Sequence, residues 1–321
     1  MKKVLAMLMS TVLCIGLLAG CGSDNSGNKV YNIGICQLVQ HVALDAATQG
    51  FKDALTEKLG AENVKFDEQN AQGDSATCAT IVNSFVSNGV DLILANATAP
   101  LQAAAAGTTT IPVLGTSVTD YATALDIDDW TGTVGRNISG TSDLAPLSEQ
   151  AAMLNELFPD STTVGVLYCS AEANSQYQAD VIKTELEALG KTVSFYSFVD
   201  TNDVQTVTQN ACDNCDVLYI PTDNTAASNT GIIDQVARAA GVPIVAGEEG
   251  ICSGCGVATL SISYYDLGYT TGLMAYEILV NGADITTLPV EYAPNVTKEY
   301  NKEICEALNI TVPDDYVAIG E

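Results

Sequence analysis

Cysteine is the residue type in this chain whose spacing most directly suggests chemistry. Eight cysteines lie beyond residue 30, and four of them form two CxxC pairs, Cys212-Asp-Asn-Cys215 and Cys252-Ser-Gly-Cys255. Two such pairs could hold a four-thiolate zinc ion, although their separation is longer than in common zinc ribbons. In an oxidising compartment the same pairs could close two local disulfides, and free thiols are the third alternative. We expect no bound metal and favour local disulfides.

The chain contains a single histidine, His41, which limits the catalytic chemistry it could perform. A metal site built from several histidines is excluded, and a nucleophilic pair of serine or cysteine with histidine would have to use this one ring. The motifs GxxxxGK[ST] and GxSxG are also absent from the sequence. We therefore expect a protein that is not an enzyme and needs no cofactor, with His41 serving as a helix cap or as a ligand hydrogen-bond partner.

Small polar residues follow most of the apolar runs, at the positions where ligand-binding loops are expected. Hydroxyls and backbone N–H groups at helix N-termini suit a carboxylate, and acidic side chains suit an ammonium, so together they indicate the backbone of an amino acid. A sugar is the alternative, since Asp and Asn also bind hydroxyls, and each residue could simply cap a helix. The candidate ligand-binding residues are Gln40, His41, Thr98, Thr116, Ser117, Asp120, Ser170, Asn174, Ser175, Asp223, Asn224 and Glu248.

Five of these candidates are predicted to form a polar clamp around the ligand. They are Asp120, Asn174, Ser175, Asp223 and Asn224. Asp223 is expected to pair with the ligand ammonium inside a desolvated site. Asn174 or Ser175 is also expected to cap the helix that follows it, and Asp223 or Asn224 the next one.

The loops connect strand-like runs and helical stretches that alternate from residue 30 onward. In the helical stretches apolar residues recur at intervals of three and four. Strands alternating with helices predict α/β units with parallel sheets. The strand-like runs are 31–39, 91–98, 111–118, 163–170, 216–223, 243–248 and 257–262, and the main helical stretches are 42–59, 75–87, 174–189 and 224–240.

The two halves of the chain resemble each other. IGICQLV near residue 33 corresponds to VGVLYCS near 164, DLILANAT at 91 to DVLYIPTD at 216, and IPVLGTSV at 111 to VPIVAGEE at 242. The three matches keep the same order along the chain, so we predict two doubly wound lobes of one design. Ligands of such sheets bind beyond the carboxyl ends of the strands, and the predicted site is therefore the cleft between the lobes.

The charge and the N-terminus indicate where the protein works. With 12 Lys and Arg against 39 Asp and Glu, the net charge of −27 argues against binding to nucleic acid. Lys2 and Lys3 precede an apolar run that ends in Leu18-Ala19-Gly20-Cys21, which resembles a bacterial lipoprotein signal. We predict a signal peptide over residues 1–20, a lipid on Cys21, a flexible tether over 21–29, and a domain held outside the cytoplasm at the bacterial cell membrane. An uncleaved anchor helix is the alternative.

Seven segments in a fixed order carry a family resemblance. They are IGICQLVQHVALDAATQGF, NAQGDSATCATIVNSFV, VDLILANATAPLQAAA, IPVLGTSVTD, VGVLYCSAEANS, DVLYIPTDNTAAS and YYDLGYTTGLMAYEIL. From about residue 30 to 315 the chain resembles the substrate-binding lipoproteins of ABC transporters, tryptophan/tyrosine type. The resemblance implies a type I periplasmic-binding-protein fold that closes on an aromatic amino acid such as Trp, Tyr or Phe and delivers it to an ABC permease and its ATPase.

The resemblance also implies how the chain divides into lobes. Three crossovers are expected near 140–146, 258–262 and 287–291, which gives a first lobe of 30–142 plus 262–288 and a second of 143–261 plus 289–321. Tyr121 stands where the family pattern has a proline, and its ring is expected at the mouth of the cleft. We expect a monomer. A sensor subunit, or a binding protein for a sugar or nucleoside, is the alternative function.

Overall fold

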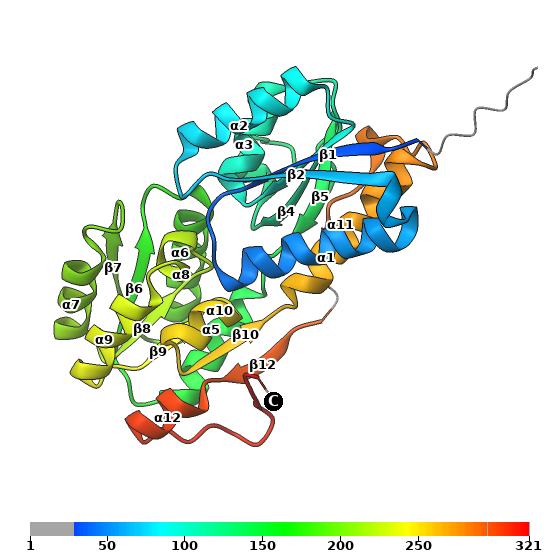
Figure 1. Ribbon diagram of the computed structural model, residues 1–321. Helices are drawn as coiled ribbons and strands as arrows, with labels where there is room; N and C mark the ends of the chain where they lie inside the picture. Colours follow the sequence, from blue (N-terminus) through cyan, green and yellow to red (C-terminus); the bar gives the residue numbers. More distant parts are fainter. Residues whose placement is uncertain (1–28, 294, 321) are drawn as a thin grey trace, which may run out of the picture.

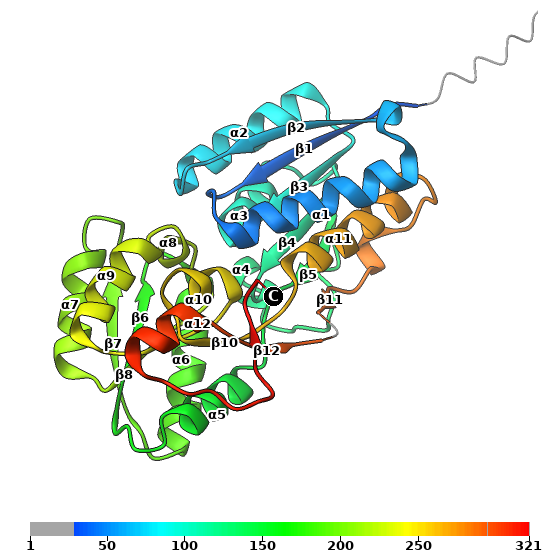
Figure 2. The same cartoon turned by 60° about the horizontal axis from the view of Figure 1, so that its bottom comes forward.

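Two mostly parallel β-sheets, each enclosed by helices, form the framework of the protein (Figures 1 and 2). The computed structural model describes residues 29–293 and 295–320. The predicted α/β architecture with two lobes is confirmed. The predicted signal peptide, Cys21 and nearly all of the tether lie outside the described residues. No helix in the described part of the chain has the length and apolar character that crossing a membrane requires.

The first lobe is built on a six-stranded sheet in the order β11-β5-β4-β3-β1-β2. Apolar side chains of β1, β3 and β4 fill cores on both of its faces, one under α2 and α3 and the other under α1 and α11. The strands are β1 (Tyr31–Gln37), β2 (Val64–Asn70), β3 (Leu92–Asn96), β4 (Val113–Val118), β5 (Ile138–Ser142) and β11 (Glu291–Tyr292). The helices are α1 (Val42–Leu59), α2 (Ser75–Asn88), α3 (Thr98–Gly107), α4 (Tyr121–Leu125) and α11 (Tyr264–Leu279), with short 3-10 turns at Ala61–Asn63 and Ile285–Thr287.

The second lobe repeats this plan around a seven-stranded sheet in the order β13-β12-β10-β9-β8-β6-β7. Only the pairing of β10 with β12 is antiparallel among its described strands. The strands are β6 (Thr163–Cys169), β7 (Thr192–Phe198), β8 (Val217–Ile220), β9 (Ile244–Ala246), β10 (Ala258–Ser261), β12 (Thr297–Tyr300) and β13 (Val317–Ala318). The helices are α5 (Leu147–Leu157), α6 (Ala173–Ala188), α7 (Val204–Asn214), α8 (Asn224–Ala227), α9 (Thr230–Ala240), α10 (Glu249–Cys255) and α12 (Lys302–Leu308).

The chain crosses between the lobes after β5, after β10, and between β11 and β12. The third crossing lies later than predicted. Glu291 pairs with Thr141 of β5, so β11 still belongs to the first sheet, and the chain crosses between Tyr292 and Thr297. A two-residue strand gives no periodic signal in the sequence, which explains the displaced boundary.

Two predictions about helices are wrong in detail. The stretch 224–240 forms two helices, because the side chain of Asn229 donates to the carbonyl of Thr225 and competes there with the helical backbone bonds. The helix expected to begin after Asn174 or Ser175 begins at Ala173, with Glu172 as its N-cap residue. Asp223 does cap α8, and its carboxylate accepts from the N–H of Ala226 at 2.7 Å.

Tyr121 does not lie at the mouth of the cleft. It is 1% exposed, its hydroxyl donates to the carbonyl of Thr141 at 3.1 Å, and its ring stacks on Trp130 with centroids 6.4 Å apart. The hydroxyl occupies space beside Gly115 and Gly140, where a Cβ atom would collide with it. The side chain therefore packs in the core of the first lobe and does not line the cleft.

The two CxxC pairs do not form the local disulfides that the sequence favoured. All eight cysteines in the described residues are free thiols, and both pairs lie at helix ends where each sulfur has surroundings of its own. The thiol of Cys215 lies 3.6 Å from the hydroxyl of Tyr196, and that of Cys255 donates to the carbonyl of Ile251 at 3.3 Å. Burial raises the pKa of Cys212 to about 11, which keeps this thiol protonated at neutral pH.

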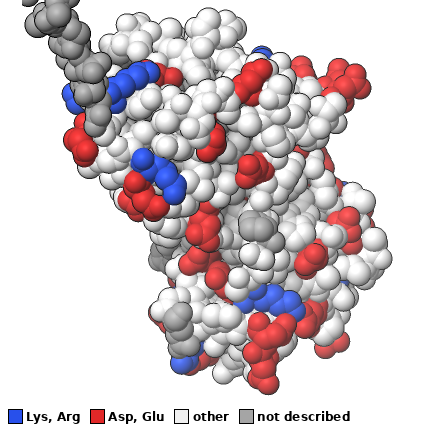
Figure 3. Space-filling model, turned by 90° about the vertical axis from the view of Figure 1, so that its right-hand side faces the viewer, with Lys and Arg blue, Asp and Glu red and all other residues white. Residues whose placement is uncertain are grey.

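Acidic side chains are spread over the face of the molecule drawn in Figure 3, and basic side chains are few there. The charge excess of the sequence therefore lies at the surface, where water screens it. A surface of this kind favours solubility and repels polyanions.

Helices α1 and α11 pack side by side at unusually close range. Three glycines make this approach possible: Gly50 faces the carbonyl of Tyr265, Gly268 faces that of Ala47, and Gly272 faces α1 as well. A Cβ atom at any of these positions would overlap the neighbouring helix. The pair is therefore held at a distance that only glycine permits.

Gly268→Ala is expected to destabilise the protein by about 1 to 3 kcal/mol, because the new methyl group overlaps the carbonyl of Ala47 and forces the helices apart. Urea unfolding would measure the loss. Gly231→Ala is the matched control, since this exposed helical glycine has open space around it and alanine should be neutral or stabilising by up to about 1 kcal/mol. Equal stability of both variants would contradict the close-packing argument.

Candidate ligand-binding site

A small cavity lies between the lobes, beyond the carboxyl ends of strands from both sheets. Its position is the one expected for a ligand site of open α/β sheets. The first lobe and the adjoining crossings contribute residues that follow β1, β4, β5 and β10, and the second lobe contributes residues that follow β6, β8 and β9. The lining residues are His41, Leu44, Ser117, Thr119, Asp143, Asn174, Thr222, Asp223, Asn224, Ala227, Glu248 and Tyr264.

Among the lining residues, Asp143 has a buried carboxylate that is only partly hydrogen-bonded. It is 3% exposed and lies at the first crossing, directly after β5. One carboxylate oxygen accepts from the hydroxyl of Tyr264 at 2.9 Å, while the other is buried without a hydrogen-bond partner. Burial raises the pKa of this carboxyl group. The lining includes neither Lys nor Arg, so no side chain of the cavity neutralises Asp143. A cationic group on a ligand would stabilise this buried carboxylate.

Two further lining residues carry buried polar atoms without a partner. They are Nδ1 of His41 and the hydroxyl of Ser117. Ser117 has φ 54°, a left-handed conformation that residues other than glycine rarely adopt, at the end of β4. With Oδ1 of Asp143, three of the six unsatisfied buried atoms in the described chain lie around this one cavity. Buried polar groups are nearly always hydrogen-bonded, so these three atoms indicate a polar ligand.

Asp223 and Glu248 add negative charge but have no free oxygen to offer. The carboxylate of Asp223 accepts from the N–H of Cys169 at 2.6 Å and of Ala226 at 2.7 Å. Glu248 accepts from Gly250 at 2.7 Å and from the next residue as the N-cap of α10. Burial raises the pKa of each acid to about 7. The predicted ammonium partner, Asp223, is therefore committed to backbone groups, whereas Asp143 is not.

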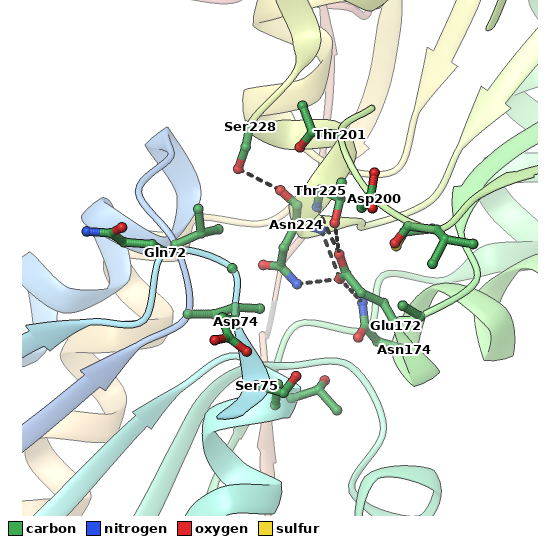
Figure 4. Close-up of a pocket in the computed structure, with 18 of the residues that line it drawn as sticks. Gln72, Asp74, Ser75, Glu172, Asn174, Asp200, Thr201, Asn224, Thr225 and Ser228 are labelled. Carbon is green, nitrogen blue, oxygen red and sulfur yellow. Dashed lines mark hydrogen bonds between the residues drawn. The ribbon is translucent and has the colours of Figure 1, made fainter. Parts of the chain in front are cut away.

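A wider groove opens outside the cavity, on one side of the cleft (Figure 4). Gln72, Asp74 and Ser75 line it from the first lobe, and Glu172 and Asp200 from the second. Asn174 and Asn224 line both the groove and the cavity. The groove and the cavity therefore adjoin at these two residues, and both are lined from the two lobes.

The structure gathers half of the twelve predicted residues at the cavity: His41, Ser117, Asn174, Asp223, Asn224 and Glu248. Thr98 lies in the outer groove, and Gln40 and Ser170 are exposed. Thr116 lies 3.2 Å from the hydroxyl of Thr141, Asp120 caps α4, and Ser175 is buried beside Asn174. Of the predicted clamp, Asp120 and Ser175 thus lie outside the cavity lining.

Asp143 and Tyr264, which lie at the first two crossings, were not among the residues predicted from the sequence. A signal was present in their position, because both follow strands that end at the cleft. Asp143 is one of 39 acidic residues, however, and nothing in its neighbours along the chain shows that it is buried.

The chain matches the family model of ABC transporter substrate-binding proteins over residues 32–319. It is 34% identical to a tyrosine-binding protein of Clostridioides difficile over 96% of this chain and 93% of that protein. A crystal structure from Streptococcus pneumonia in complex with L-Trp superposes with a TM-score of 0.85 at 31% identity, covering 89% of this chain and 97% of that one. The ligand-free, open structure of a substrate-binding protein with adhesive properties from Clostridium difficile gives 0.68 at 37% identity, covering 90% and 99%.

The stability of the protein should depend on pH through Glu248. Burial raises the pKa of this carboxyl group from 4.5 to about 7, so the folded protein binds this proton more tightly than the unfolded chain does. The contribution of Glu248 to stability therefore grows as pH falls from about 8 to 5, by on the order of 3 kcal/mol. Unfolding free energies measured by urea across this range would show the slope. Asp223, whose pKa is also raised to about 7, contributes a slope of the same sign. Glu248→Gln should therefore make the slope shallower without abolishing it, while the exposed Asp128→Asn should leave it unchanged; an unaltered slope in Glu248→Gln would refute the assignment.

Proposed function

Because the chain belongs to the family of ABC transporter substrate-binding proteins, we propose that it captures tyrosine or tryptophan between its lobes and delivers the amino acid to a permease. Proteins of this family bind solutes outside the cytoplasm, which is a non-enzymatic role. The choice of ligand is supported by two relatives, one named as tyrosine-binding and one solved with L-Trp.

The observation that carries the proposal is the set of unpaired polar atoms around the interlobe cavity. The free oxygen of Asp143 suits an ammonium group, because a buried carboxylate is stabilised when a cation with N–H donors pairs with it. The hydroxyl of Ser117 can donate to a carboxylate of the same ligand. An α-amino acid carries both charged groups on one carbon and so matches the polarity of the groups around this cavity. Asp143 takes the role that the sequence assigned to Asp223.

Capture works by hinge closure about the three crossings. The cavity is lined from both lobes, so a ligand in it makes contacts that exist only in the closed form. The superpositions support this arrangement: the L-Trp complex matches more closely than the open, ligand-free relative, although the open relative is more similar in sequence. The lobe arrangement of the present structure is thus nearer to the ligand-bound one.

The N-terminal sequence supports the second part of the proposal. Cleavage before Cys21 would leave a lipid anchor, and residues 22–29 would tether the domain near a membrane permease. The monomer with two lobes would then close, dock and release its ligand there. A sensor subunit would use the same closed form, and it is distinguished by contact with a receptor in place of a permease.

Asp143→Asn is expected to weaken tyrosine and tryptophan binding roughly 30- to 1,000-fold, or about 2 to 4 kcal/mol, because the ammonium loses its counter-charge in a desolvated site. Isothermal titration calorimetry on protein unfolded and refolded to strip retained ligand would measure this. The ligand-free variant should be at least as stable as the wild type, since a buried charge has become neutral.

Asp128→Asn, which alters an exposed acid, should bind like the wild type. The same titrations with sugars and nucleosides should show no binding. Unchanged affinity in Asp143→Asn would remove this residue from the site, and binding of sugars or nucleosides alone would overturn the proposed ligand class.

A further inference from the structure

His41 is the one side chain of the first lobe that hydrogen-bonds a side chain of the second lobe away from the crossings, among residues 29–293 and 295–320. Its Nε2 lies 3.2 Å from Oδ1 of Asn224, and the ring sits at the N-cap position of α1. The other ring nitrogen, Nδ1, is buried, has no hydrogen-bond partner, and belongs to a residue that lines the cavity. The ring therefore joins the two lobes and leaves one polar atom for another partner.

The partners of Asn224 determine which nitrogen of His41 carries the proton. Nδ2 of Asn224 donates to the carboxylate of Glu172 at 2.7 Å (Figure 4). The Oδ1 of the same amide therefore faces the histidine. An amide oxygen only accepts, so Nε2 of His41 must be the donor. Burial also lowers the pKa of His41, which favours the neutral ring at pH 7. A neutral ring protonated at Nε2 presents a bare lone pair at Nδ1.

Hydrogen bonds hold the carboxylate of Glu172 in place, and this carboxylate in turn fixes the orientation of the Asn224 amide. Its carboxylate accepts from the backbone N–H of Asn224 at 3.1 Å, from the N–H of Thr225 at 2.9 Å and from the Thr225 hydroxyl at 2.8 Å. A flipped Asn224 amide would direct its oxygen at this carboxylate and lose the 2.7 Å bond. Glu172 and Asn224 are thus positioning residues for the His41 tautomer.

We propose that Nδ1 of His41 accepts a hydrogen bond from the ring of the ligand, either the phenol O–H of tyrosine or the indole N–H of tryptophan, and so selects against phenylalanine. The proposal rests on the proposed function, in which Asp143 binds the ammonium group and Ser117 the carboxylate. The donor on the ligand ring is then the group left for Nδ1. An acceptor that is already buried gains a partner from tyrosine and stays unpaired with phenylalanine, which is why such sites discriminate strongly.

Two pairs of ligands test this on the wild-type protein by calorimetry. One pair is tyrosine and phenylalanine, and the other is tryptophan and 3-(3-benzothienyl)alanine, in which sulfur replaces the indole N–H. We expect the member without the donor to bind roughly 10- to 100-fold more weakly in each pair. Binding within two-fold for both pairs would overturn the inference and leave the proposed function standing, while binding of none of the four would overturn both.

His41→Phe separates a specific contact from a structural one. The variant keeps a ring of similar size but has no Nδ1, so the ratio of phenylalanine to tyrosine dissociation constants should fall to about 1. Asp143→Asn is the matched comparison, because it removes a contact common to both ligands and should weaken both while preserving the ratio. A ratio that is unchanged in His41→Phe would overturn the inference.

The single histidine also permits a direct spectroscopic test that needs no variant. In protein without a histidine tag, labelled with ¹⁵N-histidine, nitrogen NMR of the ligand-free form at pH 7 should show a proton on Nε2 and none on Nδ1. Adding tyrosine should shift the Nδ1 resonance upfield as it accepts a hydrogen bond, and adding phenylalanine should not. A proton on Nδ1, or equal shifts with both ligands, would contradict the proposed role.

Discussion

A carboxylate buried at the first crossing, with no cation among the residues around it, is the constraint on which the arrangement of the cleft depends. Asp143 lies where β5 leaves the first lobe, and its carboxylate accepts from the hydroxyl of Tyr264, at the second crossing. The protein thus places an electrostatic cost in a segment that connects its lobes. In the proposed hinge mechanism, a ligand that brings a positive charge relieves this cost in the closed form, which would couple ligand charge to lobe closure through the Asp143 side chain.

The close pair of α1 and α11 explains how the first lobe presents the site as a unit. The helices run parallel, since Ala47 meets Gly268 and Phe51 meets Gly272 further along both. Their N-termini therefore lie together at the cavity, with His41 before one and Tyr264 at the start of the other. The positive ends of both helix dipoles face the acidic cavity and partly offset its charge. Glycine contacts far from the ligand thus fix the relative positions of two residues that line the site.

The fold was predictable from the sequence because buried parallel strands and amphipathic helices each leave a local pattern. The location of the cleft followed from the same pattern, and His41, Asn174 and Asn224 do lie there. Asp143 was not predictable, because its burial arises where separate crossings meet and not from its neighbours in sequence. Asp223 was assigned to the ligand because an acidic residue after a strand can either bind a ligand cation or cap the next helix. In the fold both of its carboxylate oxygens accept from backbone N–H groups.

The balance between open and closed forms depends on the polar contacts that the two lobes make with each other. One hydrogen bond, from His41 to Asn224, joins their side chains away from the crossings in the described part of the chain, and a bond of this kind contributes about 1 kcal/mol. In this arrangement three polar atoms around the cavity are buried without partners, and each costs about 1 to 3 kcal/mol. As far as these polar groups are concerned, closing the lobes without a ligand is therefore unfavourable. A ligand that hydrogen-bonds all three atoms removes this cost, and it can do so only in the closed form. The stability of the closed form therefore depends on which polar groups the ligand carries.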